Sequence, residues 1–176
     1  MPKADVKKRY DFDNAARIIR DAGGKVVGRT KLQKMAYLLE LAGLGDGFPF
    51  QYRHYGPYSE QLSQAVELAD LFGLVKEEEY QASWGGRYSI YSFVGDDISK
   101  TDMLRAKLLE FAVQSDPIEL ELAATAAFLF AEGEPNVWQE TCKRKPDKSA
   151  LGRIDKAKSL YSKLRELSEG RLPQVG

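Results

Sequence analysis

The sequence predicts a mainly α-helical, α+β protein. It should have a winged-helix-like N-terminal half with a small β-hairpin, residues 10–95, packed against a C-terminal helical half, residues 96–170. Three stretches with helical apolar spacing precede two β-rich stretches around a glycine turn, which is the element order of a winged helix, and the spacing is helical again from Ser99 onward. The length of 176 residues fits one domain. A flexible basic arm, residues 1–9, and a tail, residues 171–176, are expected to flank it.

The first two helices are indicated by their ends. The first is expected to start near Asp11 or Asp13, because Phe12 begins an apolar stripe at i, i+3, i+4 and i+7. The second is expected to start at Thr30 as the N-cap residue, with Gln33 completing a capping box three residues later.

A stretch rich in glycine, proline and aromatic residues follows over residues 44–58, with a turn expected at its Gly-Pro pair. Ser59 is then expected to cap the third helix. A strand over residues 74–78, a turn over 84–87 and a return strand over 88–94 form the predicted hairpin, since the return strand is dense in aromatic and β-branched residues.

Four further helices are predicted in the C-terminal half, the first capped by Ser99. Asp116 and Pro117 supply an N-cap and a first-turn proline for the next helix. Residues 120–131 are apolar almost all round, so this helix should be central and buried. A short helix near residues 137–140 and a last one over about residues 147–168 complete the prediction.

Composition excludes several classes of protein. The chain is 43% hydrophobic and 30% charged, which is typical of a globular protein. The longest nearly continuous apolar run, residues 122–131, is too short to cross a bilayer, so no membrane association is expected. A single cysteine and the lack of a signal-peptide pattern at the start of the chain predict a cytoplasmic location. One histidine and one cysteine exclude a structural zinc site, and neither a metal nor a cofactor is expected.

The N-terminal half contains two motifs. The first, at residues 30–37, is Thr-Lys-Leu-Gln-Lys followed by two hydrophobic residues and a tyrosine. The second, at residues 55–57, is Tyr-Gly-Pro. Over about residues 10–95 the chain resembles the YwgA-like prokaryotic proteins and, more distantly, the Panacea and SocA-like antitoxin domains. The resemblance implies a helical domain with a small sheet that binds protein partners. In the antitoxin branch the partner is a toxin, or a toxin together with a protease.

Aromatic side chains alternate with arginine and histidine around the second motif, a composition typical of protein-binding hot spots and of base-stacking surfaces. A tryptophan at the predicted hairpin tip is expected to be partly exposed. The candidate partner-binding residues are Tyr52, Arg53, His54, Tyr55, Tyr58 and Trp84. The structural alternative is that the rings pack over the junction of the second and third helices, and that the tryptophan folds back on the sheet.

The net charge is zero but unevenly distributed, with six acidic residues and one basic residue over 59–80 and ten basic and four acidic residues over 142–171. The helix over residues 59–72 stands where a winged helix reads DNA, yet it carries carboxylates that repel phosphate and suit a basic protein partner. The candidate contacts for nucleic acid or an acidic partner are therefore Arg29, Lys31, Lys34, Lys143, Arg144 and Lys145. For Lys31 and Lys34 the alternative is a plain solvated helix face.

The sequence contains no recognisable nucleophile–base set and no phosphate-binding glycine loop, so no catalytic residue is assigned and an enzyme is not expected. The leading hypothesis is a non-enzymatic protein-interaction module, an antitoxin or adaptor in a prokaryotic toxin–antitoxin or defence setting. The alternative is a nucleic-acid-binding transcriptional regulator that uses a basic face other than the acidic helix.

Overall fold

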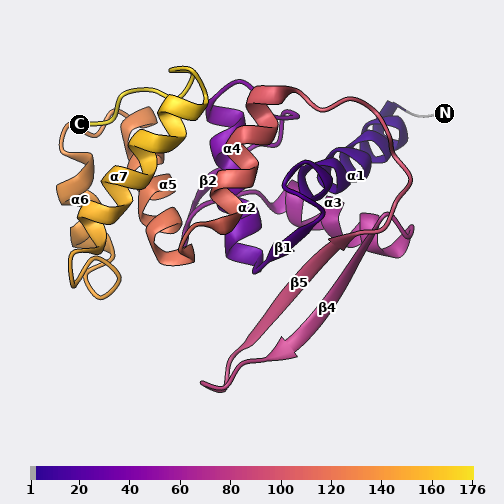
Figure 1. The fold of residues 1–176 in the computed structure, drawn as a ribbon, viewed down its shortest axis with the longest axis horizontal. Coiled ribbons are helices and arrows are strands. Elements are labelled where there is room, and N and C mark those ends of the chain that lie inside the picture. The colour runs from indigo at the N-terminus through magenta and orange to yellow at the C-terminus, as the bar shows by residue number, and fades with distance from the viewer. Residues whose placement is uncertain (1–2) are drawn as a thin grey trace.

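The computed structural model describes the backbone of residues 3–176 and the side chains of residues 11–176. Within this range it is a mixed α+β protein (Figure 1). The helices are α1 (Lys3–Asp21), α2 (Arg29–Leu41), α3 (Glu60–Leu71), α4 (Met103–Gln114), α5 (Pro117–Ala131), α6 (Val137–Arg144) and α7 (Arg153–Leu167). The strands are β1 (Lys25–Val27), β2 (Gln51–Arg53), β3 (Gly56–Tyr58), β4 (Val75–Gln81) and β5 (Arg87–Phe93).

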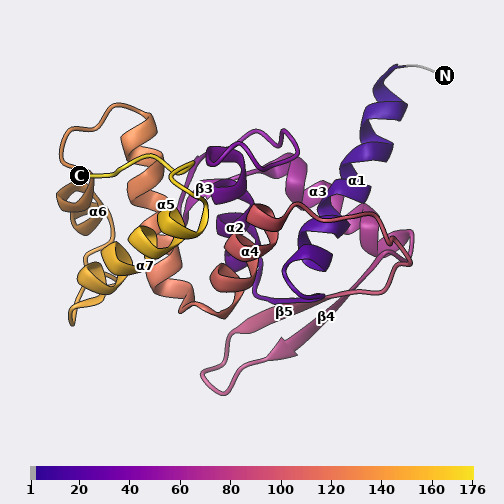
Figure 2. The same ribbon diagram turned by 45° about the horizontal axis from the view of Figure 1, so that its top comes forward.

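The larger sheet has the strand order β1-β5-β4, with antiparallel neighbours. Its register places Glu77 opposite Tyr91 and Glu79 opposite Ser89. Figures 1 and 2 both show the β4–β5 hairpin projecting from the helical body. The hairpin was predicted, whereas β1 was not, because three residues are too few to show an alternating pattern.

Strands β2 and β3 form a second sheet in the stretch where the sequence predicted a turn at the Gly-Pro pair. Tyr52 lies opposite Pro57 in this sheet. Proline is tolerated there because both strands of a two-stranded sheet are edge strands.

Several helix boundaries differ from the predicted ones. Helix α1 begins at Lys3, so residues 3–9 of the expected flexible arm are helical. These residues include no glycine or proline, so nothing in their sequence breaks a helix. Residues 1 and 2 of that arm lie outside the described residues. The N-cap of α2 is Gly28 instead of Thr30, and that of α4 is Asp102 instead of Ser99.

The predicted N-terminal signals of α3 and α5 are confirmed. The Ser59 hydroxyl accepts a hydrogen bond from the Leu62 N–H (3.1 Å), and the Asp116 carboxylate accepts from the N–H groups of Ile118 and Glu119. These bonds satisfy helix N–H groups that have no partner within the helix.

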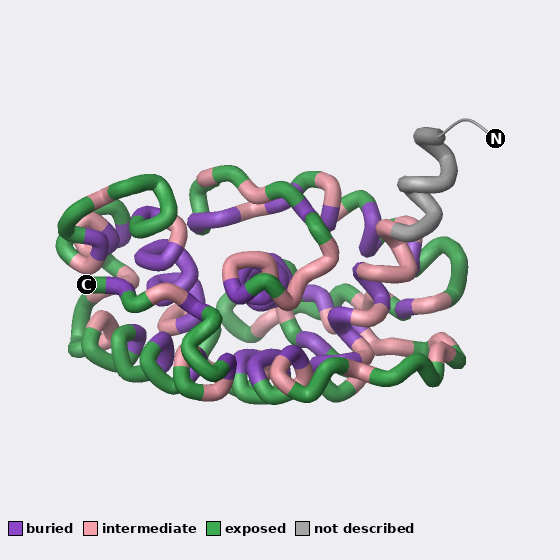
Figure 3. Tube along the Cα trace, turned by 90° about the horizontal axis from the view of Figure 1, so that it is seen from above, coloured by how far each residue is buried: buried purple, intermediate pink, exposed green. Residues whose placement is uncertain are grey.

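Helix α5 lies in the middle of the hydrophobic core, as its continuous apolar sequence predicted. Residues 120–127 are all buried, and the core continues from α1 and α2 through α5 to α7. Figure 3 shows buried positions along the inner faces of the helices and exposed positions on their outer faces and in the loops. None of the described helices has the length and apolar character needed to cross a bilayer.

Candidate functional site

Hydrogen bonds between Gln33 and Ser59 connect the first motif, on α2, to the start of α3. The Gln33 side-chain amide donates to the Ser59 carbonyl (3.0 Å), and the Ser59 N–H donates to the Gln33 side-chain oxygen (2.8 Å). The predicted capping box with Thr30 is therefore wrong. The true partner lies 26 residues away in the chain, which local spacing does not reveal.

Lys34 binds the second motif from the same helix. Its side chain is 1% exposed, and its Nζ donates to the Pro57 carbonyl at 2.7 Å. Burial lowers the pKa of Lys34 to about 7, although the nearby Glu121 carboxylate raises it in part. The expected contact of Lys34 with phosphate or with solvent is therefore wrong, because the protein encloses its amine.

Lys31 is also used within the fold. Its Nζ donates to the carbonyls of Val113 (2.9 Å) and Ser115 (2.8 Å) at the C-terminal end of α4. A lysine in this place satisfies carbonyl groups that have no partner within their own helix. Burial lowers the pKa of Lys31. This lysine is thus partly buried and does not lie on a plain solvated face.

The lowered pKa of Lys34 predicts a stability that depends on pH. The pKa is 10.5 in the unfolded chain and about 7 in the folded protein. Between these values the unfolded state binds more protons, so the free energy of unfolding should rise with pH, by at most about 1.4 kcal/mol per pH unit.

Urea unfolding at about pH 7, 8 and 9 checks this expectation. Lys34→Met should flatten the rise, whereas Lys107→Met, at an exposed lysine of α4, should keep the wild-type slope. Identical slopes for wild type and Lys34→Met would contradict the lowered pKa.

Helix α5 and the segment after α6 position the turn between β2 and β3. Gly56 has φ +89°, and a Cβ at this residue would lie 2.5 Å from Thr125 Oγ1. Lys145 Nζ donates to the His54 carbonyl (3.2 Å), and Lys148 Nζ lies 4.7 Å from the centroid of the Tyr55 ring. The C-terminal half therefore determines where Tyr55 lies.

Glu121 holds both of these lysines. It is 3% exposed, and its carboxylate accepts hydrogen bonds from Lys145 (2.7 Å) and from Lys148 (2.8 and 2.9 Å). Glu121 was not among the candidate residues predicted from the sequence. The available signal was a single charged residue within the apolar stretch 120–131 that was predicted to be buried.

An open groove of about 910 Å³ lies between the β4–β5 hairpin, the N-terminal end of α2, helix α3 and the β2–β3 turn; we call it the hairpin groove. It brings together half of the predicted candidates, drawn from both sets: Arg29, Lys31, Lys34, Tyr55, Tyr58 and Trp84. Tyr55 is 58% exposed and Trp84 is 77% exposed. Leu62 and Val66 of α3 contribute apolar surface.

Trp84 packs on the turn of the β4–β5 hairpin. A Cβ at Gly86 would overlap the indole ring, so the ring lies directly against the glycine backbone. The two predictions for this tryptophan, that it is partly exposed and that it folds back on the sheet, both hold in part. Its ring folds back on the hairpin turn and still remains largely exposed. Packing of this kind restricts the ring before a partner binds and reduces the entropy lost on binding.

Arg29 and two glutamates of the β4–β5 hairpin form a cluster of ion pairs in the hairpin groove. Arg29 donates to Glu77 and Glu79, at 2.9 Å in each case, and the Ser89 hydroxyl donates to Glu77 at 2.7 Å. Burial raises the pKa of Glu77, but the hydrogen bonds from Ser89 and Arg29 outweigh it, so the pKa lies below its ordinary value. The alternation of the hairpin, which puts both glutamates on one face, was the sequence signal for this cluster.

Three of the predicted partner-binding residues lie outside the lining of the hairpin groove. Tyr52 is partly buried, with its ring 5.9 Å from the ring of Phe128 in α5, a helix that the structural alternative did not name. Arg53 is exposed and lies 5.7 Å from the centroid of the Tyr58 ring. His54 is exposed, and its backbone carbonyl is the group that the protein uses.

The basic residues 143–145 at the C-terminal end of α6 do not present three free cations. Lys145 is buried in its ion pair with Glu121. Arg144 pairs with Glu140 at 2.8 Å and lies 4.9 Å from the centroid of the Tyr52 ring. Lys143 is exposed. The expected contact of Lys145 with a nucleic acid or an acidic partner is therefore wrong, since its amine is enclosed.

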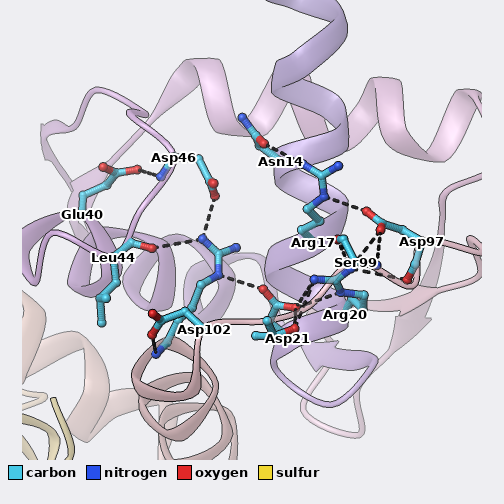
Figure 4. A network of polar contacts seen from close by, with 12 residues as sticks. Asn14, Arg17, Arg20, Asp21, Glu40, Leu44, Asp46, Asp97, Ser99 and Asp102 are labelled. Atoms are coloured by element: carbon cyan, nitrogen blue, oxygen red, sulfur yellow. Dashed lines mark hydrogen bonds and ion pairs between the residues drawn. The ribbon is translucent and has the colours of Figure 1, made fainter.

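A second polar network joins α1, α4 and two connecting segments (Figure 4). Arg105 is buried and donates to Asp21 (2.8 Å) and Asp46 (3.0 Å). Arg17 donates to Asp97 at 2.7 Å, and this hydrogen bond lowers the pKa of Asp97. The partners lie 59 to 84 residues apart in the chain, so no sequence pattern revealed them. The network connects the two halves of the protein.

Among the described residues no group of three or more histidine, cysteine, aspartate or glutamate side chains is arranged to hold a metal ion. Comparison of the chain with protein-family models, curated proteins and solved structures finds no match. The geometry of the hairpin groove is therefore the basis for a functional proposal.

Proposed function

We propose that this chain is a non-enzymatic protein-interaction module, a cytoplasmic antitoxin or adaptor whose hairpin groove receives a segment of a protein partner. One observation carries the proposal: Tyr55 and Trp84, from segments far apart in the sequence, are strongly exposed and line the same groove. Exposed aromatic side chains of this kind dominate the binding energy of protein interfaces. The resemblance of the two motifs to the YwgA-like and Panacea proteins supports the same role.

We also propose that residues 10–95 are organised as a winged helix. The order α1, β1, α2, α3, β4, β5, with the short strands β2 and β3 inserted between α2 and α3, and the pairing of β1 with β5 support this organisation. Helix α3 then takes the place of the DNA-reading helix. It carries Glu60, Glu67 and Asp70 and contains no lysine or arginine, which favours a protein partner over DNA on this face.

Capture of partners from the native host by the tagged full chain tests the proposed function. Wild type should enrich a discrete protein at low and at moderate salt, with and without nuclease treatment. Trp84→Ala and Tyr55→Ala should each weaken capture by about tenfold or more, because truncating a central aromatic residue costs about 2 kcal/mol or more in binding.

Phe130→Ala is the matched control, since Phe130 is an exposed aromatic residue of α5 that does not line the hairpin groove. Its capture and the thermal unfolding of all three variants should remain near wild type. Capture that disappears with nuclease would contradict the proposal and support the nucleic-acid alternative. A groove variant that unfolds would show that the replaced side chain belongs to the core.

A further inference from the structure

A second groove, of about 1080 Å³, lies along the outer side of α3, next to Asp11 of α1 and the segment 49–51; we call it the α3 groove. Phe50, Leu68 and Leu71 supply its apolar surface, and Leu71 is 75% exposed. Figures 1 and 2 show α3 beside α1 at the end of the molecule away from α5–α7. The described elements therefore leave this apolar strip uncovered.

The charges of the α3 groove all have the same sign. Asp11, Glu60 and Glu67 line it, and no lysine or arginine stands among the lining residues that the structure describes. Asp11 accepts a hydrogen bond from the Gln61 side chain. Within residues 11–176 neither Glu60 nor Glu67 forms an ion pair. A cation that enters this groove therefore meets carboxylates that those residues do not neutralise.

We propose that the α3 groove binds a cationic amphipathic segment of a protein partner. Apolar side chains of that segment lie on the strip around Leu68 and Leu71, and its lysine or arginine side chains face Glu60, Glu67 and Asp11. Burial of the apolar strip supplies affinity. The carboxylates select a basic segment and speed its association.

The α3 groove is a different surface from the hairpin groove, although Tyr58 and Glu67 line both. The hairpin groove is lined by the basic residues Arg29, Lys31 and Lys34 as well as by carboxylates, whereas the charged residues that line the α3 groove in the described part of the chain are all acidic. Binding at the α3 groove therefore does not depend on Tyr55 or Trp84.

A labelled amphipathic peptide of about 14 residues, with leucine on one helical face and lysine on the other, is a suitable probe. Fluorescence anisotropy at low ionic strength should show that it binds the full chain. Combining Glu60→Gln with Leu71→Ala should weaken its binding by about five- to tenfold. Trp84→Ala should leave that binding unchanged, which separates this proposal from the proposed function of the hairpin groove.

Glu110→Gln combined with Leu151→Ala is the matched control, because it removes an exposed carboxylate and an exposed leucine that do not line the α3 groove. It should bind the peptide as wild type does. Equal loss in this control, no binding of the lysine peptide, or equal binding of a peptide with glutamate in place of lysine would each overturn the proposal. A dimer in light scattering that Glu60→Gln with Leu71→Ala abolishes would assign the α3 groove to a second copy instead, and would also overturn it.

Discussion

Replacing Glu121 with glutamine is expected to lower the free energy of unfolding by about 3–5 kcal/mol. The Glu121 carboxylate faces the buried Lys145 amine at 2.7 Å and the partly exposed Lys148 amine at 2.8 Å. Removing one partner of a buried ion pair leaves the other charge in the interior without compensation, and this costs more than the pair itself contributes. Urea unfolding at neutral pH measures the loss.

Glu140→Gln is the control for the Glu121 variant. Glu140 also pairs with a cation, Arg144, at 2.8 Å, but Arg144 is exposed and Glu140 is only partly buried, so its replacement should cost at most about 1 kcal/mol. Combining Glu121→Leu with Lys145→Met should be less destabilising than either single change, because neither charge of the buried Glu121–Lys145 pair then remains without its partner. Similar costs for Glu121→Gln and Glu140→Gln would show that water reaches the buried pair.

Replacing Gly56 with alanine is expected to cost about 2–5 kcal/mol. The positive φ of +89° at this residue strains any side chain, by about 1–2 kcal/mol. The new Cβ would also meet Thr125 Oγ1 at 2.5 Å, and crowding of this kind in a packed interior costs about 1–3 kcal/mol. Because Gly56 stands beside Tyr55, the same change should weaken partner capture through the hairpin groove.

Two further variants separate strain from crowding at Gly56. Gly73→Ala, at φ +75° with nothing within 4 Å of the new Cβ, should show the cost of strain alone, about 1–2 kcal/mol. Adding Thr125→Ala to Gly56→Ala should recover about 1–2 kcal/mol by removing the crowded hydroxyl, which is buried and has no hydrogen-bond partner among the described residues. No recovery in the double variant would contradict the role assigned to this contact.

The charged and polar residues of the first motif show why local patterns predicted part of the site and not the rest. Their positions on α2 followed from helical spacing, and so did the buried stripe of Leu32 and Met35. Their roles did not, because Gln33 bonds to Ser59, Lys34 to Pro57 and Lys31 to the end of α4. A polar side chain in a helix is assigned to solvent by default, and only the packing of distant segments shows that it is enclosed.

Distant segments also decide which of the candidate partner-binding residues are packed and which are exposed. Their aromatic character marked the stretch 52–58 as a contact surface or as core, and composition alone could not separate the two. Tyr52 packs beside Phe128, whereas Tyr55 stays exposed next to Lys148. The difference is set by α5 and by the segment after α6, which lie more than 60 residues further along the chain.

The α+β class, the β4–β5 hairpin, the start of α3 at Ser59 and the central place of α5 could all be predicted from the sequence, because helical spacing, capping residues and a continuous apolar run act between near neighbours. Which charges are free became visible in the folded protein alone. The tertiary structure encloses Lys34, Lys145 and Glu121 together, pairs Arg29 with the hairpin glutamates and leaves the carboxylates of the α3 groove exposed. Burial and pairing depend on segments that meet through the core, and these determine the chemistry that each surface offers to a partner.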